Sequence, residues 1–176
     1  MIAVLTDTSV LLKWFHLEGE DEVPAARAML RAHRAEQVDV KILDLSMYEL
    51  GNILLRKLGW TARDVADQLD DVHILCGSPL ALVDVWRREA ADLAEQHGLS
   101  FYDAAFAAAA RGLGVSLVSA DRQLIATGLA ESVTVYVERM GSLNSSRSNP
   151  GLVRVRVRPV RHPHPWIKPL PEGEGV

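Results

Sequence analysis

Several features that identify common classes of protein are absent from this sequence. Cys76 is its only cysteine, which excludes an internal disulfide or a cysteine-rich zinc site and makes a reducing cytoplasm the expected location. No stretch of about 18 residues is apolar and free of charge, which argues against a transmembrane helix. The first residues lack the basic region and the cleavage site of a signal peptide, so we expect none.

Motifs that bind nucleotides or zinc are missing as well. There is no GxGxxG after the first apolar segment and no GxxxxGK[ST], so sites for dinucleotides and nucleoside triphosphates are not indicated. The six histidines are scattered and none forms an HExxH pair, which argues against a zinc hydrolase. What remains is a 176-residue chain whose length and composition predict one globular domain.

Basic charge is scarce over most of the chain. The sequence carries 19 Lys and Arg against 23 Asp and Glu. Residues 141–176 hold six of the basic and two of the acidic side chains, which leaves 13 and 21 in residues 1–140, a net charge of −8. A protein that binds nucleic acid through bulk electrostatics would be basic. Either residues 1–140 avoid nucleic acid, or some of their acids hold a cation that reverses the local charge.

Short apolar segments alternate with amphipathic segments as far as Arg139. We predict strands at residues 1–6, 40–43, 114–119 and 133–137, and a strand with a turn within residues 74–83. Helices are predicted at residues 9–15, 20–36, 46–58, 84–97, 100–111 and 121–126, with one more that Thr61 caps. This order predicts an α/β fold with a mostly parallel sheet of four to five strands. From Gly141 the sequence becomes linker-like, then basic and Pro-rich, so we divide the chain into residues 1–140 and an extension, 141–176.

Four acidic residues occupy corresponding places in this predicted order. Asp7 follows the first strand, Glu49 lies early in the helix after the second, Asp103 opens an Ala-rich helix, and Asp121 follows residues 114–119. The carboxyl ends of parallel strands and the adjacent helix starts line one crevice. Four carboxylates there would raise one another's pKa unless a cation neutralised them. Mg²⁺ or Mn²⁺ suits such oxygen ligands, and could polarise a phosphodiester and activate water.

Each acid also has a simpler interpretation. Asp7 and Asp103 could be helix N-caps, the commonest use of Asp at such positions. Glu49 could lie on a solvated helix face, and Asp121 could open a turn. The metal site is favoured because all four acids fall at the same edge of the predicted sheet.

The segments around these acids resemble the PIN-domain ribonucleases, and among them the VapC toxins of toxin–antitoxin pairs. The resemblance covers about the first 138 residues, through VLTDTSVLLKWF, DLSMYELGNILLR, LSFYDAAFAAAARGLGVSLVSADRQL and VTVY. It implies an α/β/α sandwich that cuts single-stranded or structured RNA, often tRNA or rRNA, with Mg²⁺ or Mn²⁺. On this resemblance Asp7 and Asp103 hold the metal most directly, while Glu49 and Asp121 are further ligands, direct or through water.

Three polar residues match positions that support the acids in that family. Ser9 matches a hydroxyl residue beside the first Asp, and Ser119 matches another, two residues before Asp121. Asn52, one helical turn after Glu49, could orient that side chain or a water. The family further implies a homodimer and inhibition by a VapB-like antitoxin, which can place a basic side chain among the acids.

Two features depart from the family. Residues 141–176 have no counterpart there, and are either a basic arm that contacts RNA or a disordered extension without function. Residues 1–140 offer few cations to hold RNA, and the candidates are Arg56, Lys57, Arg87, Arg88, Arg111 and Arg122. The alternative function is a non-catalytic PIN-like module that binds RNA or a protein. Against it, four crowded carboxylates cost stability unless they hold a metal.

Overall fold

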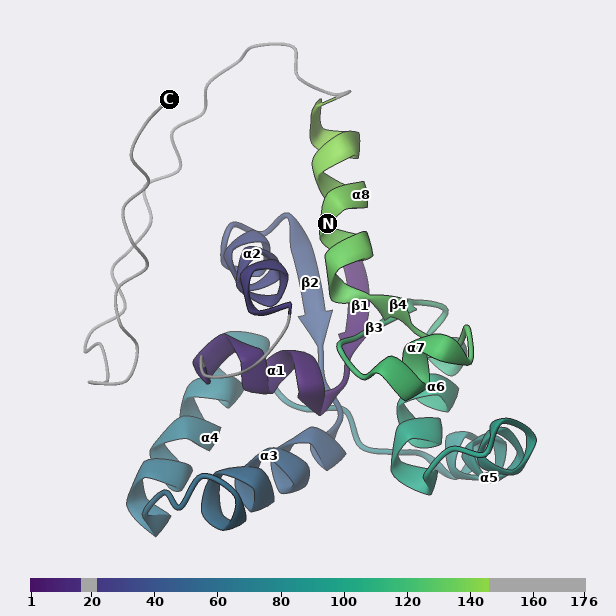
Figure 1. The fold of residues 1–176 in the computed structure, drawn as a ribbon, viewed down its shortest axis with the longest axis horizontal. Helices are drawn as coiled ribbons and strands as arrows, with labels where there is room; N and C mark the ends of the chain where they lie inside the picture. The colour runs from purple at the N-terminus through teal and green to yellow at the C-terminus, as the bar shows by residue number, and fades with distance from the viewer. Residues whose placement is uncertain (17–21, 146–176) are drawn as a thin grey trace.

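A parallel β-sheet lies at the centre of the molecule (Figure 1). The computed structural model describes residues 1–16 and 22–145. Within them the sheet has four strands in the order β2-β1-β3-β4, and every adjacent pair is parallel. The strands are β1 (Ile2–Thr6), β2 (Val38–Lys41), β3 (Ser116–Ser119) and β4 (Glu131–Ser132). The number of strands and their direction agree with the prediction.

The described residues form eight helices. These are α1 (Thr8–Phe15), α2 (Val23–Arg34), α3 (Asp44–Arg56), α4 (Ala62–Cys76), α5 (Asp84–His97), α6 (Phe101–Leu113), α7 (Arg122–Ala126) and α8 (Val133–Ser145). The first seven confirm the predicted helices. Thr61 caps α4 as expected, because its hydroxyl accepts a hydrogen bond from the Asp64 N–H. No helix within these ranges is long and apolar enough to cross a membrane.

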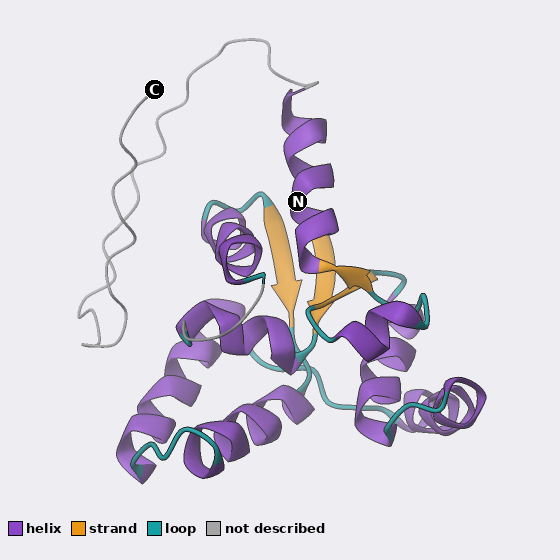
Figure 2. Ribbon diagram, viewed as in Figure 1, coloured by secondary structure: helices purple, strands orange, loops and turns teal. Residues whose placement is uncertain are grey.

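Successive side chains of the central strands pack alternately into two separate hydrophobic cores, one on each face of the sheet. In β1, Val4 packs into one core while Leu5 packs into the other, and Val118 and Leu117 of β3 divide in the same way. Helices α1, α2 and α8 cover the first face, and α6, with α5 packed on it, covers the second (Figure 2). The fold is therefore the three-layer α/β/α sandwich that the sequence predicts.

The predicted strand at residues 133–137 is wrong, because this segment begins α8. Its sequence VTVYV favours a strand by local propensity. However, Val133 and Tyr136 are buried in the first core, and Val137 and Met140 pack against it. That spacing of three, four and seven residues follows one face of a helix, so packing decides the structure over propensity. The helix also crosses residue 140, and the predicted extension beyond Ser145 lies outside the described residues.

The predicted strand within residues 74–83 is also wrong. Its first three residues complete the last turn of α4, which ends where Gly77 adopts a φ of 75°. Only Leu80 pairs with another extended segment. Its N–H donates to the Ile42 carbonyl and its carbonyl accepts from the Asp44 N–H, each at 2.9 Å. The apolar run therefore forms a single bridge just beyond the end of β2.

Close packing of α5 on α6 predicts opposite effects for two glycine substitutions. A Cβ at Gly112 would lie 1.9 Å from Nε1 of Trp86, whereas a Cβ at Gly141 would meet nothing within 4 Å. We expect Gly112→Ala to lower the free energy of unfolding by about 1–3 kcal/mol because of overpacking. Gly141→Ala, the matched control in α8, should raise it by up to about 1 kcal/mol. Chemical denaturation measures both, and an unchanged Gly112→Ala would contradict the packing described.

Candidate active site

Asp7 occupies the junction between β1 and α1. Because β1 ends at Thr6 and α1 begins at Thr8, the backbone places this side chain at the carboxyl edge of the sheet. Its Oδ1 accepts a hydrogen bond from the Val10 N–H at 3.3 Å, so Asp7 is the N-cap of α1. The capping interpretation therefore holds for this residue. It does not exhaust the role of the carboxylate, whose two oxygens have further partners.

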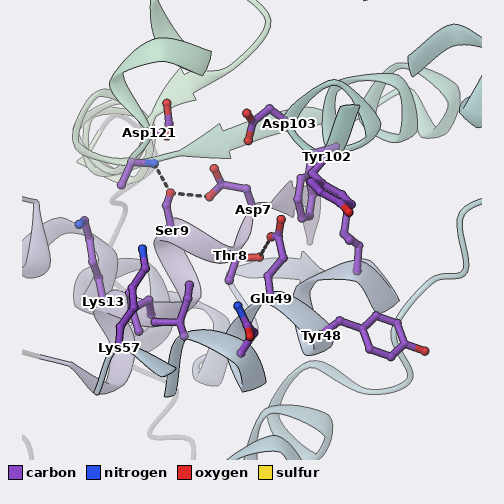
Figure 3. A pocket seen from close by; sticks show the side chains of 16 residues that line it. Asp7, Thr8, Ser9, Lys13, Tyr48, Glu49, Lys57, Tyr102, Asp103 and Asp121 are labelled. Atoms are coloured by element: carbon purple, nitrogen blue, oxygen red, sulfur yellow. Dashed lines mark hydrogen bonds between the residues drawn. The ribbon is translucent and has the colours of Figure 1, made fainter. Parts of the chain in front are cut away.

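Two serines connect Asp7 to the loop that carries Asp121. Ser9 donates its hydroxyl to Asp7 Oδ1 at 2.6 Å and accepts from the Ala120 N–H at 2.9 Å. Ser119 donates to Asp7 Oδ2 at 2.5 Å and accepts from the Asp121 N–H at 2.9 Å. These paired bonds fix the carboxylate and hold the end of β3 against the start of α1, and Figure 3 shows the two that Ser9 makes.

Glu49 reaches the same region from α3. Its Oε2 accepts a hydrogen bond of 2.5 Å from the hydroxyl of Thr8. Thr8 was not singled out from the sequence, although it stands between Asp7 and Ser9 in a run of hydroxyl side chains. Asn52, one turn after Glu49, is exposed and lines the same cavity.

Asp103 and Asp121 lie at the starts of two other helices. Ser100, not Asp103, is the N-cap of α6: its hydroxyl accepts from the Asp103 N–H and donates to Oδ2 of Asp103 at 2.6 Å. The capping interpretation is therefore wrong for Asp103. Asp121 does cap α7, because its Oδ1 accepts from the N–H groups of Gln123 and Leu124 at 2.7 and 3.0 Å.

All four acids line one cavity of about 730 Å³ at the carboxyl ends of the strands. Figure 3 shows the labelled side chains of Asp7, Glu49, Asp103 and Asp121 around this space. Ser9 and Asn52 also line it, whereas Ser119 lies fully buried behind Asp7. The structure thus brings every predicted site residue into the cavity or its immediate support.

The electrostatics of this acid cleft are those of crowded, partly buried carboxylates. Burial raises the pKa of Asp7 from 3.8 to about 6, the hydroxyls of Ser119 and Ser9 lower it, and the charge of Asp121 raises it. Burial likewise raises the pKa of Glu49, against the lowering effect of the Thr8 hydroxyl and with a raising effect from Asp103. A cation in the cleft would oppose these shifts, because it favours the ionised carboxylates.

The oxygen ligands that the four acids offer are of the kind that a hard divalent cation binds. They are carboxylate oxygens, and the hydrogen bonds described above leave one oxygen each of Glu49, Asp103 and Asp121 to a ligand. Mg²⁺ and Mn²⁺ take such ligands and retain several waters. Among the described residues, no three Asp, Glu, His or Cys side chains converge closely enough to hold an ion by themselves. Bound waters or a closer approach of the acids would therefore have to complete the coordination.

The fold and the cleft together define a class: an α/β/α protein whose carboxylates gather at the carboxyl ends of parallel strands. The PIN domain family model matches residues 4–129, and the chain belongs to this family. A solved structure titled PAE2754, from Pyrobaculum aerophilum, is similar over 80% of this chain and 99% of that one, with a TM-score of 0.56 and 30% identity.

Two further proteins resemble the chain. Exonuclease VapC9 of Pyrobaculum aerophilum is 36% identical over 92 residues, which is 48% of this chain and 64% of that curated relative. The match therefore spans slightly less than two thirds of the relative. The structure of FitAB bound to an IR36 DNA fragment shares the fold, with a TM-score of 0.53 over 72% of this chain and 92% of that one, at 19% identity.

Proposed function

We propose that this protein is a metal-dependent endoribonuclease that hydrolyses RNA phosphodiester bonds and acts as the toxin of a VapBC-like pair. The observation that carries the proposal is the cleft into which four separate segments bring four carboxylates. Membership of the PIN domain family and the similarity to Exonuclease VapC9 support a nuclease. A parallel sheet with its acids at the strand ends is also where α/β proteins bind ligands.

The acids would divide the work of holding Mg²⁺ or Mn²⁺. Asp7 and Asp103 would hold the ion most directly, with Glu49 and Asp121 as further ligands. When bound, the ion supplies an activated water and stabilises the charge that develops on the phosphate. The hydroxyl of Ser9 orients Oδ1 of Asp7, and the hydroxyl of Ser119 orients Oδ2.

Glu49 is the side chain best suited to receive a proton. Burial raises its pKa, and Thr8 fixes its Oε2, so that Oε1, if it held the ion through a water and not directly, could accept a proton from that water. Asn52 lines the cavity one turn away and would orient Glu49 or this water. The phosphoryl group then passes directly to water, and no protein nucleophile is required.

The partners follow from the same proposal. The substrate would be tRNA or rRNA, and the inhibitor a VapB-like antitoxin that brings a basic side chain to the four acids. A homodimer in the cytoplasm is the form that we expect to act. Of the cations expected to hold RNA, Lys57 lines the cleft, while Arg87 pairs with Asp84 and Arg111 pairs with Glu89.

Thr8→Val tests how Glu49 is positioned. The substitution removes the hydroxyl without changing the size of the side chain, so Glu49 loses its donor and its pKa rises further. We expect RNA cleavage to fall by about 10–100-fold and the acidic limb of the pH–rate profile to move to higher pH. Thr8→Ser retains the hydroxyl and should keep the wild-type profile. Equal profiles for both variants would show that this hydrogen bond has no part in the reaction.

Cleavage of a mixed pool of tRNA and rRNA tests the proposed function itself. The purified protein is incubated with Mg²⁺, Mn²⁺ or EDTA, and a circularised RNA is treated in parallel. We expect discrete fragments with either metal, none with EDTA, and linearisation of the circle, because only an endonuclease cuts RNA that has no ends. Shortening of linear RNA alone would identify an exonuclease. RNA binding without cleavage would identify the non-catalytic module.

A further inference from the structure

We propose that Tyr48 and Tyr102 stack on unpaired bases that flank the scissile phosphate. This proposal rests on the proposed function and adds to it the part of the substrate that the cleft recognises. It concerns two aromatic side chains that neither the fold nor the acid cluster accounts for.

Both tyrosines stand at the rim of the acid cleft and precede an acid in the sequence. Tyr48 comes directly before Glu49 on α3, and Tyr102 comes directly before Asp103 on α6. Both line the cavity, yet 74% of Tyr48 and 58% of Tyr102 is exposed. Figure 3 shows Tyr102 close to Asp103, and Tyr48 at the edge of the cleft with its ring directed away from Glu49.

The fold makes no evident use of these two rings. Within the described residues, the aromatic contacts join Trp14 to Phe15 and to His33, and Arg139 lies over the ring of Tyr136. Neither Tyr48 nor Tyr102 takes part in them. An aromatic side chain loses little entropy when a flat partner covers it, and a nucleobase offers such a partner in every sequence.

The cleft is polarised in the way that a nucleotide strand requires. In Figure 3, Lys57 lies on one side of Asp7 and Glu49, and the two tyrosines lie on the other. A strand that crosses the cleft can therefore turn its phosphates toward Lys57 and its bases toward the tyrosines. The phosphodiester between two bases then comes to the acids.

Stacking also resolves the charge problem of residues 1–140. Their net charge of −8 repels the RNA backbone, so bulk electrostatics cannot supply the affinity that basic proteins obtain from it. Stacking on aromatic rings does not depend on charge. Bases within an A-form helix are already stacked and their faces are covered, so this form of recognition selects unpaired nucleotides.

Steady-state cleavage of a short unstructured RNA with Mn²⁺ tests the proposal. For Tyr48→Ala and for Tyr102→Ala we expect a KM at least about tenfold higher, with kcat within about twofold of wild type. Tyr→Phe at either position should restore the KM, since the ring and not the hydroxyl stacks. Phe101→Ala is the matched control: it removes an aromatic ring that is 45% exposed on α6 and does not line the cavity, so its KM should not change.

Substrate variants separate this proposal from the proposed function. On the same RNA with abasic positions around the cleaved bond, the wild type should show the raised KM, and neither Tyr→Ala variant should raise it further. An unchanged KM in both Ala variants, or a failure of Phe to restore it, would overturn the stacking proposal while leaving the nuclease intact. If the wild type cuts no RNA, the nuclease proposal fails, and fluorescence anisotropy with the same RNAs and variants then decides the stacking proposal.

Discussion

Asp7→Asn is expected to lower RNA cleavage by roughly 10³-fold, comparable to the loss of a group that stabilises charge in a transition state. An amide cannot neutralise a cation, and Asp7 is the most buried of the four acids. The folded protein should tolerate the change. Burial raises the pKa of the carboxylate to about 6, so a neutral side chain avoids the cost of a buried charge, and Asn still offers an oxygen to the Val10 N–H. The rate on the RNA pool and a denaturation curve measure the two effects.

Asp92→Asn provides the matched control for this substitution. It makes the same chemical change at an exposed position of α5 outside the acid cleft, so cleavage should remain at the wild-type rate. If Asp7→Asn kept more than a tenth of the activity, Asp7 would not be a principal ligand. Equal fragments from both variants and wild type would identify a contaminating nuclease.

The positions of the acids were predictable from the sequence because parallel strands share one geometry. Asp7 follows β1 directly and Asp121 follows β3 after one residue, and an acid just beyond a strand needs no tertiary information to be placed at the sheet edge. Ser9 and Ser119 were expected near the acids from the family resemblance. The distance from Ser119 to Asp7 arises only when β1 and β3 pair, since 112 positions of sequence separate the two residues.

The parts of the structure that the sequence did not predict depend on contacts between distant segments. Val133 and Tyr136 are β-formers by local preference, and their helical state follows from the core that they enter. Thr8 acquires its role only because α3 brings Glu49 to it from 41 positions away. The capping box of Ser100 and Asp103 was, by contrast, readable as S-x-x-D, and its recognition would have moved the start of α6 to Phe101.

A divalent cation is expected to stabilise the protein strongly at pH 7.5 and weakly at pH 5. In the unfolded chain Asp7 ionises near pH 3.8, whereas the folded protein holds its proton up to about pH 6. Between these values the folded state binds more protons, so stability falls as the pH rises, and above pH 6 the ionised Asp7 costs about 3 kcal/mol. A cation in the cleft offsets that cost because it favours the ionised form. Below pH 6 it must displace the proton first.

Thermal denaturation with Mn²⁺ or Mg²⁺ at the two pH values measures this coupling. At 100 times the dissociation constant a ligand contributes about 2.7 kcal/mol, which corresponds to a rise in Tm of about 5–10 °C for a chain of this size. We expect such a rise at pH 7.5, its reversal by EDTA, and a much smaller rise at pH 5. Asp7→Asn should lose both the rise and its pH dependence, while Asp92→Asn should keep them. No rise at millimolar metal would count against a cation site at these four acids, and an equal rise at both pH values would place the cation away from Asp7.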